Sequence, residues 1–94
     1  MVALYKKAHT LVINGNKGIL VRLYNTTIVT VDYTSHSITL DTGGFNTKTT
    51  KDRMNLTSYT FNLGFRVYQK NFTWYVSYKG KEMMFEGHDI TFII

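Results

Sequence analysis

The sequence predicts an α+β protein, predominantly antiparallel β, in which a meander of short strands carries one short helix near residues 50–61. Three observations lead to this fold class. Threonine and the aromatic and β-branched residues, which suit a pleated and half-buried surface, are abundant. Proline is absent, and short runs of alternating apolar and polar residues are separated by Asn, Gly, Thr and Ser turns. One central segment instead has its apolar residues at helical spacing.

Short strands are expected on both sides of the helix. The first ends at residues 11–13, and the Asn-Gly pair at 14–15 is typical of a hairpin turn. In the strand at 27–33, simple alternation places Ile28 on the face opposite Val29. The other predicted strands are 19–24, Ser37–Asp41, 64–70, Thr73–Tyr78, 82–85 and 88–94.

The helix is predicted from its start signal, its apolar face and its stop signal. Thr49, three residues before Asp52, is a suitable N-terminal cap. Residues 54, 58 and 61 then share one face, and Gly64 provides a glycine stop. The Thr and Asn content gives low intrinsic helix propensity, so we expect this helix to depend on packing.

Length and composition limit the class of protein. Ninety-four residues form a single domain, 1–94, because a second core could not be buried. The absence of cysteine excludes a disulfide scaffold, a zinc ribbon and a thiol nucleophile. A secreted domain this small usually needs disulfides, so we expect a cytoplasmic protein. Charged residues near the start and the lack of a long apolar run predict neither a signal peptide nor a membrane partner.

The net charge of +5 is unevenly distributed. Residues 1–41 carry +2, residues 42–81 carry +6 and residues 82–94 carry −3. A basic middle segment favours anionic partners such as a nucleotide, nucleic acid or an acidic protein. The alternative is that the charge serves only solubility.

Five sequence blocks occur in a fixed order: 23–30 (LYNTTIVT), 38–45 (ITLDTGGF), 49–55 (TTKDRMN), 64–68 (GFRVY) and 74–76 (WYV). In this order the chain resembles a family of small, uncharacterised proteins of bacteriophages and related mobile elements, over roughly residues 18–87. The resemblance implies a phage origin and the host-cell cytoplasm, and no particular activity. The chain departs from the family pattern at Phe45, where Trp is usual, and at Asp52, where a basic residue is frequent. The second departure weakens any argument from a dense basic patch.

The first candidate site runs from residue 42 to residue 55, where a glycine pair leads through a Thr-rich loop into the helix. Successive backbone N–H groups there, together with the helix dipole, can form an anion-binding concavity. Hydroxyl donors and cations follow closely, and an aromatic ring of Phe45 or Tyr24 is available to stack on a base. The alternative is a simple tight turn followed by a Thr cap. The proposed ligand-binding residues are Gly43, Gly44, Phe45, Thr49, Thr50, Lys51 and Arg53, with Thr47 and Lys48 beside them.

The second candidate site is the aromatic and basic segment from residue 65 to residue 78. Tyr rings beside Arg and Lys on adjacent strands resemble surfaces that bind single-stranded nucleic acid. For this alternative function the residues are Arg66, Tyr68, Lys70 and Tyr75. The competing interpretation is purely structural: Phe65, Val67, Trp74 and Val76 form the core, and Tyr68, Tyr75 and Tyr78 cover the outer face.

Metal and enzyme chemistry find little support. His9, His36 and His88, with Glu86 and Asp89 near the last of them, lack ligand spacing such as H-x-x-x-H, so no metal or cofactor is predicted. No G-x-S-x-G motif is present. We therefore expect a protein that is not an enzyme.

These observations lead to one preferred function and two alternatives. The preferred function is a non-enzymatic phage accessory protein that binds a small anionic ligand, such as a nucleotide, and thereby sequesters a host defence signal. The first alternative is nucleic-acid binding through the aromatic strands. The second is a protein-interaction module or homo-oligomer, in which exposed strands pair with a host protein or with a second copy.

Overall fold

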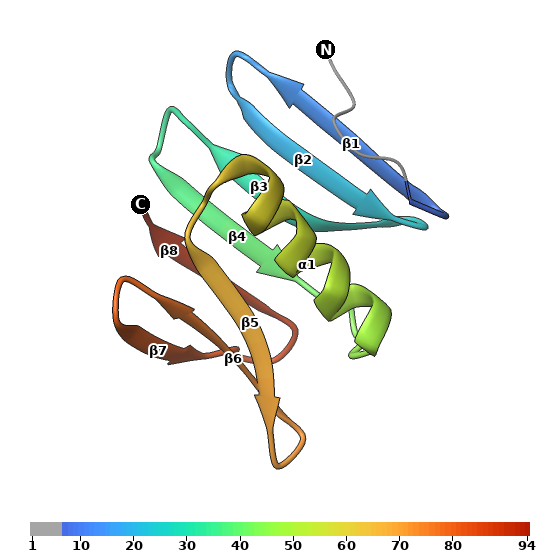
Figure 1. The fold of residues 1–94 in the computed structure, drawn as a ribbon, viewed down its shortest axis with the longest axis vertical. Helices are drawn as coiled ribbons and strands as arrows, with labels where there is room; N and C mark the ends of the chain where they lie inside the picture. The colour runs from blue at the N-terminus through green and yellow to red at the C-terminus, as the bar shows by residue number, and fades with distance from the viewer. Residues whose placement is uncertain (1–6) are drawn as a thin grey trace.

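A computed structural model describes residues 7–94, which form two antiparallel sheets and one helix (Figure 1). The predicted fold class, predominantly antiparallel β with one short helix, is confirmed. The first predicted strand segment spans residues 2–13, and its residues 2–6 lie outside the described residues. The elements in chain order are β1 (Thr10–Gly15), β2 (Gly18–Leu23), β3 (Thr26–Asp32), β4 (Ser37–Asp41), α1 (Lys48–Phe61), β5 (Phe65–Lys70), β6 (Thr73–Tyr78), β7 (Lys81–Met84) and β8 (Asp89–Ile93).

The larger sheet has the order β1-β2-β3-β4-β8. Its first four strands form the predicted meander, whereas β8 returns from the far end of the chain to pair with β4. The hairpin between β1 and β2 turns at Asn16-Lys17, because Gly15 already pairs with Gly18. The Asn-Gly pair therefore closes the ladder instead of forming the turn.

A β-bulge in β3 changes which side chains enter the core. Val21 pairs with Val29 but Arg22 pairs with Thr27, so Ile28 is an extra residue without an opposite partner. Ile28 and Val29 are consequently both buried, at 1% and 0% exposed. The prediction that these two side chains lie on opposite faces is wrong at this point, because simple alternation does not pass through a bulge.

The smaller sheet has the order β5-β6-β7 and is built from two tight hairpins. Asn71 and Phe72 both have positive φ, as do Lys79 and Gly80. Two consecutive central residues of positive φ are what a type I′ turn requires. Such turns match the twist of the flanking strands, which explains the short connections.

The helix begins two residues earlier than predicted. Thr47 is the N-cap: its Oγ1 accepts a hydrogen bond from the Thr50 N–H at 3.2 Å. The prediction that Thr49 caps the helix is therefore wrong. At the other end Asn62, with φ 56°, is the left-handed residue and its N–H reaches the carbonyls of Ser58 and Tyr59. Asn62 thus replaces Gly64 as the stop signal, because Asn also tolerates this conformation.

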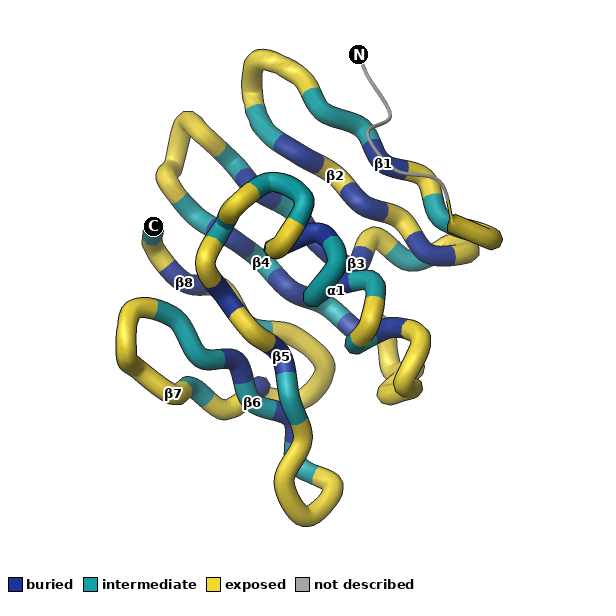
Figure 2. The backbone as a smooth tube through the Cα atoms, viewed as in Figure 1, coloured by how far each residue is buried: buried dark blue, intermediate teal, exposed yellow. Residues whose placement is uncertain are grey.

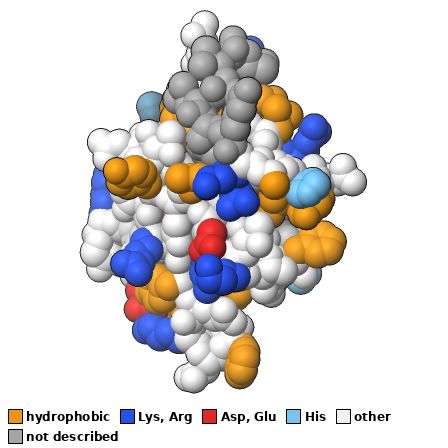
Figure 3. Space-filling model, turned by 45° about the vertical axis from the view of Figure 1, so that its right-hand side comes forward, with side chains coloured by type: hydrophobic (Ala, Val, Ile, Leu, Met, Phe, Trp, Pro, Cys, Tyr) orange, Lys and Arg blue, Asp and Glu red, His pale blue; other side chains and the backbone are white. Residues whose placement is uncertain are grey.

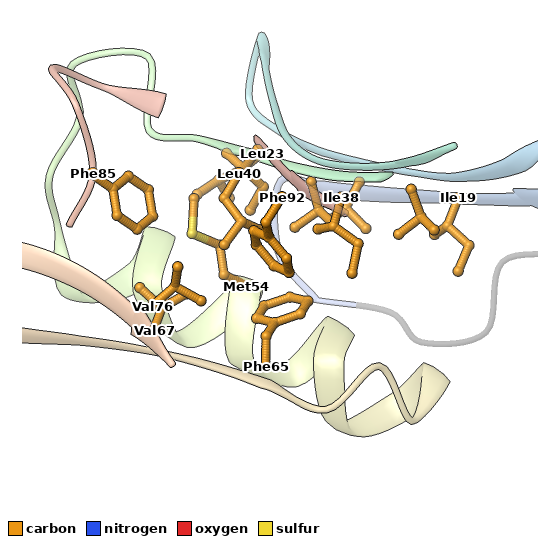
Figure 4. Close-up of a cluster of buried hydrophobic side chains, with 14 of the residues drawn as sticks. Ile19, Leu23, Ile38, Leu40, Met54, Phe65, Val67, Val76, Phe85 and Phe92 are labelled. Atoms are coloured by element: carbon orange, nitrogen blue, oxygen red, sulfur yellow. The ribbon is translucent and has the colours of Figure 1, made fainter. Parts of the chain in front are cut away.

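The hydrophobic core lies between the larger sheet on one side and the helix with the smaller sheet on the other (Figures 1 and 2). Met54 points from the helix into its centre, between Leu40 and the pair Val67 and Val76 (Figure 4). The rings of Phe65 and Phe92 join the two sheets edge to face, with centroids 6.1 Å apart. The sequence-predicted core residues Phe65, Val67, Trp74 and Val76 are all buried.

Tyr78 departs from the predicted arrangement of the smaller sheet. It was expected on the outer face with Tyr68 and Tyr75, but it packs against the core, 5.0 Å from Phe92 between ring centroids. Strand alternation explains the difference, because residues 74, 76 and 78 of β6 are two positions apart and therefore line the same face of the sheet, the one that is buried at Trp74 and Val76.

Within residues 7–94, no helix is long and apolar enough to cross a membrane. The single helix has 14 residues and carries Lys, Asp and Arg side chains.

Candidate functional site

A pocket of about 390 Å³ lies where the start of α1 meets the turn between β2 and β3. We call it the helix-end pocket. This volume is within the range of about 300–1,000 Å³ that small-molecule sites occupy. Its lining residues come from three separate segments and none of them is charged: Leu23, Tyr24, Asn25, Thr26, Ile28, Thr42, Phe45, Thr47, Thr49 and Thr50.

The glycine pair shapes the loop that leads into this pocket. Gly43 and Gly44 have φ of 61° and 88°, and a Cβ at Gly43 would lie 2.7 Å from Thr26 Cγ2. Their N–H groups donate to Asp41 Oδ1 at 2.8 Å and to Thr42 Oγ1 at 3.2 Å. The expected anion-binding concavity is therefore not formed by these two amides, because both already have acceptors within the chain.

The first turn of α1 has free amides instead. The first N–H groups of a helix have no acceptor within the helix. At the N-cap, the side-chain hydroxyl of Thr47 accepts a hydrogen bond from the N–H of Thr50, the third residue of the helix. For Lys48 and Thr49 the described part of the chain provides no acceptor. Thr49 lines the pocket, whereas Lys48, which precedes it, does not. Both N–H groups lie at the positive end of the helix dipole, a position that favours an anion.

Two exposed aromatic rings border the pocket. Tyr24 is 63% exposed and Phe45 is 64% exposed. Tyr24 sits in the β2–β3 turn with φ 53°, and its ring stacks on His9 with centroids 4.4 Å apart. Exposed rings at the edge of a pocket provide flat surfaces for a planar ligand, as aromatic residues do in sites that bind bases.

The cations predicted for this site lie elsewhere. The Nζ of Lys51 is 5.9 Å from the centroid of the Trp74 ring, and Nε of Arg53 donates to Thr10 Oγ1 at 3.1 Å. Lys48 forms an ion pair with Asp52 at 3.0 Å. The structure thus brings Phe45, Thr49, Thr50 and Tyr24 to the helix-end pocket, and places Gly43, Gly44, Lys51 and Arg53 outside its lining.

Lysine and arginine side chains do not form one continuous patch on the face shown in Figure 3. They are scattered over this face, and an acidic side chain lies between two of them near its middle. Hydrophobic side chains occur between the charged ones. This distribution offers no long basic stripe on this face of the kind that a nucleic-acid backbone would follow.

The residues of the second candidate site share the outer face of the smaller sheet. Tyr68 and Tyr75 are direct cross-strand partners and their rings stack on each other, with centroids 5.8 Å apart. Lys70 lies over both rings and pairs with Glu82 at 2.9 Å. The hydrogen bond from Lys70 lowers the pKa of Glu82, and the Glu82 carboxylate raises the pKa of Lys70. Lys70 and Glu82 thus neutralise each other on this face, whereas Arg66 is exposed and forms no ion pair within residues 7–94. The role of this face in nucleic-acid binding stays a prediction.

The three histidines lie apart in the fold. His9 stacks on Tyr24, and His36 occupies the β3–β4 turn with φ 53°. The imidazole of His88 lies close to Gly44. Among residues 7–94 no group of three potential metal-ligating side chains comes together.

Four of the ten lining residues were not predicted from the sequence: Leu23, Asn25, Thr26 and Ile28. Leu23, Asn25 and Thr26 lie about twenty positions before the Thr-rich loop, and only the fold brings them next to it. The signal that could have found them is Tyr24 itself, an aromatic residue in a turn position where it is costly for the backbone.

The fold and the pocket define a small two-sheet α+β protein with a ligand-sized, uncharged pocket at the end of its helix. Comparison with protein families identifies the chain more closely: residues 2–92 match the family described as Kyanoviridae Gp96 protein, and the chain belongs to this family. It is therefore a phage protein, as the resemblance in its sequence implied. No curated protein and no solved structure matched the chain.

Proposed function

We propose that this phage protein is a non-enzymatic accessory protein that binds a nucleotide-like ligand in the helix-end pocket. The planar base lies against the rings of Tyr24 and Phe45. The phosphate lies at the free N–H groups of Lys48 and Thr49. The observation that carries the proposal is that two exposed aromatic rings and the first turn of the helix, with the free N–H of Thr49, meet at one pocket. Lys48 precedes Thr49 in this turn and lies outside the pocket lining.

Hydroxyl groups supply the remaining polar contacts in this proposal. Thr47 and Thr49 both line the pocket and are exposed, so their hydroxyl groups are available to a ligand. Thr50 is 1% exposed and its hydroxyl is 3.1 Å from that of Thr47, so it supports the cap more than it reaches a ligand. The pocket walls at Leu23 and Ile28 are apolar and suit the edge of a base.

Charge recognition in this pocket is expected to be modest. No lining side chain is charged, so the negative group is stabilised by amides, hydroxyls and the helix dipole. Lys48 is the nearest cation in the sequence and its ammonium is neutralised by Asp52. A ligand with few negative charges, such as a nucleoside monophosphate or a cyclic nucleotide, fits better than a triphosphate.

A biological use follows from the phage origin. Sequestering a cyclic nucleotide or an ADP-ribose derivative would remove a host defence signal from the cytoplasm. This use needs only tight binding in the pocket and no catalysis, which agrees with the composition of the lining.

Isothermal titration with AMP, adenosine, cyclic nucleotides and ADP-ribose tests the proposal. We expect AMP to bind more tightly than adenosine, because only AMP engages the helix amides. Lys48→Pro removes one free N–H at the first helical position, where proline is tolerated, and should weaken AMP binding. Lys48→Ala keeps this N–H and is the matched control.

The aromatic wall is tested with Tyr24→Asn. Asparagine tolerates the positive φ of this turn, so the fold should be retained while the ring is lost. We expect AMP affinity to fall by about 5-fold to 150-fold, since stacking on one ring is worth about 1–3 kcal/mol. Equal binding of AMP and adenosine would contradict the role of the helix amides. Unchanged AMP binding by both Tyr24→Asn and Lys48→Pro, or no AMP binding by the native protein, would show that nucleotides are not recognised in this pocket.

A further inference from the structure

The two sheets together have four edge strands, and these differ in how their outer backbone groups are covered. β5 is closed by the helix, whose Asn55 and Ser58 side chains bond to the backbone of Val67 and Phe65. In β1 the central residue Val12 is 2% exposed, so the backbone groups of Val12 are not accessible to a partner. The other two edges, those of β7 and β8, border a common groove.

The outer edge of β8 is accessible. Thr42 donates its N–H to His88 O, and Ile94 donates its N–H to His36 O. Hydrogen-bonded and non-hydrogen-bonded residue pairs alternate along an antiparallel ladder. Counting from these two bonds, Ile90 and Phe92 bond to β4, whereas Thr91 and Ile93 direct their N–H and C=O groups away from β4. Both Thr91 and Ile93 are exposed.

A groove of about 460 Å³ runs beside this edge, between β7 and β8. Figure 1 shows both strands on the left-hand side of the molecule, where the C-terminus also lies. Of the residues that line the groove, Met84 on β7 is 53% exposed. Ile93, further along β8 and outside the lining, is 69% exposed. An accessible strand edge beside a groove with exposed apolar side chains is the arrangement to which an extended peptide adds as a further strand.

The charge of this region identifies the partner chemistry. Residues 82–94 carry three acidic side chains and no Lys or Arg. Glu86 and Asp89 border the groove, and neither takes part in an ion pair within residues 7–94. Asp41 is the cross-strand partner of Asp89 and adds to the negative charge at this end of the edge. Such a rim attracts a basic segment and repels an acidic one.

We propose that the β8 edge binds an extended basic segment of a partner protein by strand addition. The backbone of the segment pairs with Thr91 and Ile93, and its Lys or Arg side chains meet Glu86 and Asp89. This surface is separate from the helix-end pocket, so its function does not depend on the pocket.

A peptide that alternates lysine with valine, blocked at both ends, is the probe. Amide chemical shifts of the uniformly labelled protein should change at residues 89–93 and in β7 when this peptide is added. Thr91→Pro removes an outward N–H without a ladder bond to β4, so the strand is expected to form and peptide binding to be lost. Thr91→Val keeps the N–H and should bind like the native protein.

The charge contribution is tested separately with Glu86→Lys combined with Asp89→Lys. We expect the affinity for the lysine peptide to fall about tenfold, as for charge changes at an interface rim. Asp52→Lys, which makes the same type of change on the helix, is the control. Binding of the lysine peptide by Thr91→Pro as by the native protein, or shifts confined to other edges, overturns the proposal. A protein that dimerises alone and becomes monomeric in Thr91→Pro also overturns it, in favour of a second copy.

Discussion

Asn55 on the helix forms two hydrogen bonds with the backbone of Val67 on the edge strand β5. Its Nδ2 donates to the Val67 carbonyl at 2.9 Å, and the Val67 N–H donates to its Oδ1 at 2.7 Å. Ser58, one helical turn later, does the same with Phe65, at 2.6 and 3.0 Å. These helix side chains thus take the place that a neighbouring strand would have, and they close an edge that would otherwise be open.

The first prediction concerns this closure. Asn55→Ala should lower the free energy of unfolding by about 1–3 kcal/mol, because it leaves a part-buried N–H and C=O of Val67 without partners. Amides of β5 should also exchange faster with solvent. Urea unfolding and hydrogen exchange measure both effects. Asn46→Ala, at an exposed loop position, is the control, and an equal loss of stability in both variants would contradict the role of Asn55.

The second prediction distinguishes the two threonines at the start of the helix. Thr47→Ala should destabilise the protein by about 1 kcal/mol, because the N-cap hydroxyl that accepts from Thr50 is lost. Thr49→Ala should have an effect close to zero on stability, since Thr49 is exposed and caps nothing. Thermal unfolding of both variants tests the assignment, and a larger loss in Thr49→Ala would restore the cap that the sequence predicts.

The third prediction concerns strain in the β5–β6 turn. Phe72 has φ 67° and is 92% exposed, so it has little contact to lose and an unfavourable backbone conformation. Phe72→Gly should stabilise the fold by about 0.5–1 kcal/mol, because glycine adopts this conformation without steric cost. Phe72→Ala removes the ring but keeps the backbone penalty, and should be near neutral. Urea midpoints that rank alanine above glycine would refute the argument.

The fourth prediction is a dependence on pH. The N–H groups of Thr34 and Ser35 donate to Asp32 Oδ1 at 2.9 and 3.3 Å and hold the pKa of this carboxyl below its usual value of 3.8. The ionised form therefore favours the folded state. Its contribution is complete above the unfolded pKa and is lost as the pH falls through the lower folded pKa.

Asp32→Asn should remove this part of the acid dependence. Unfolding measured between about pH 5 and about pH 2 should show a shallower decrease for the variant than for the native protein. An NMR titration of the Asp32 carboxyl provides the direct check. A midpoint at or above 3.8 would show that the two backbone hydrogen bonds do not act on its ionisation.

Local patterns predicted most elements of the fold well. Strands Ser37–Asp41 and Thr73–Tyr78 have the predicted bounds, because alternation and flanking turn residues agree there. The helical face formed by Met54, Ser58 and Phe61 is also confirmed, with the first two buried and the third partly so. Spacing along the chain suffices for these features, since each depends on neighbours in sequence.

Features that need contacts between distant segments were missed or misplaced. The bulge at Ile28 depends on the register between two strands, and the fifth strand of the larger sheet comes from the other end of the chain. The directions of Lys51 and Arg53 were set by Trp74 and Thr10, which lie far away in sequence. Composition indicated a basic segment but could not show that Lys51 and Arg53 lie outside the pocket lining.

The sequence by itself determined a β-rich single chain with one helix, its phage character and an aromatic, Thr-rich loop before the helix. Only the tertiary structure decided that this loop meets Tyr24 across a pocket, that the glycine amides are occupied, and that β5 is closed while β8 is accessible. The physical reason is that periodicity encodes which face of an element is buried. Which faces and edges then meet is fixed by packing between segments that are remote in the chain.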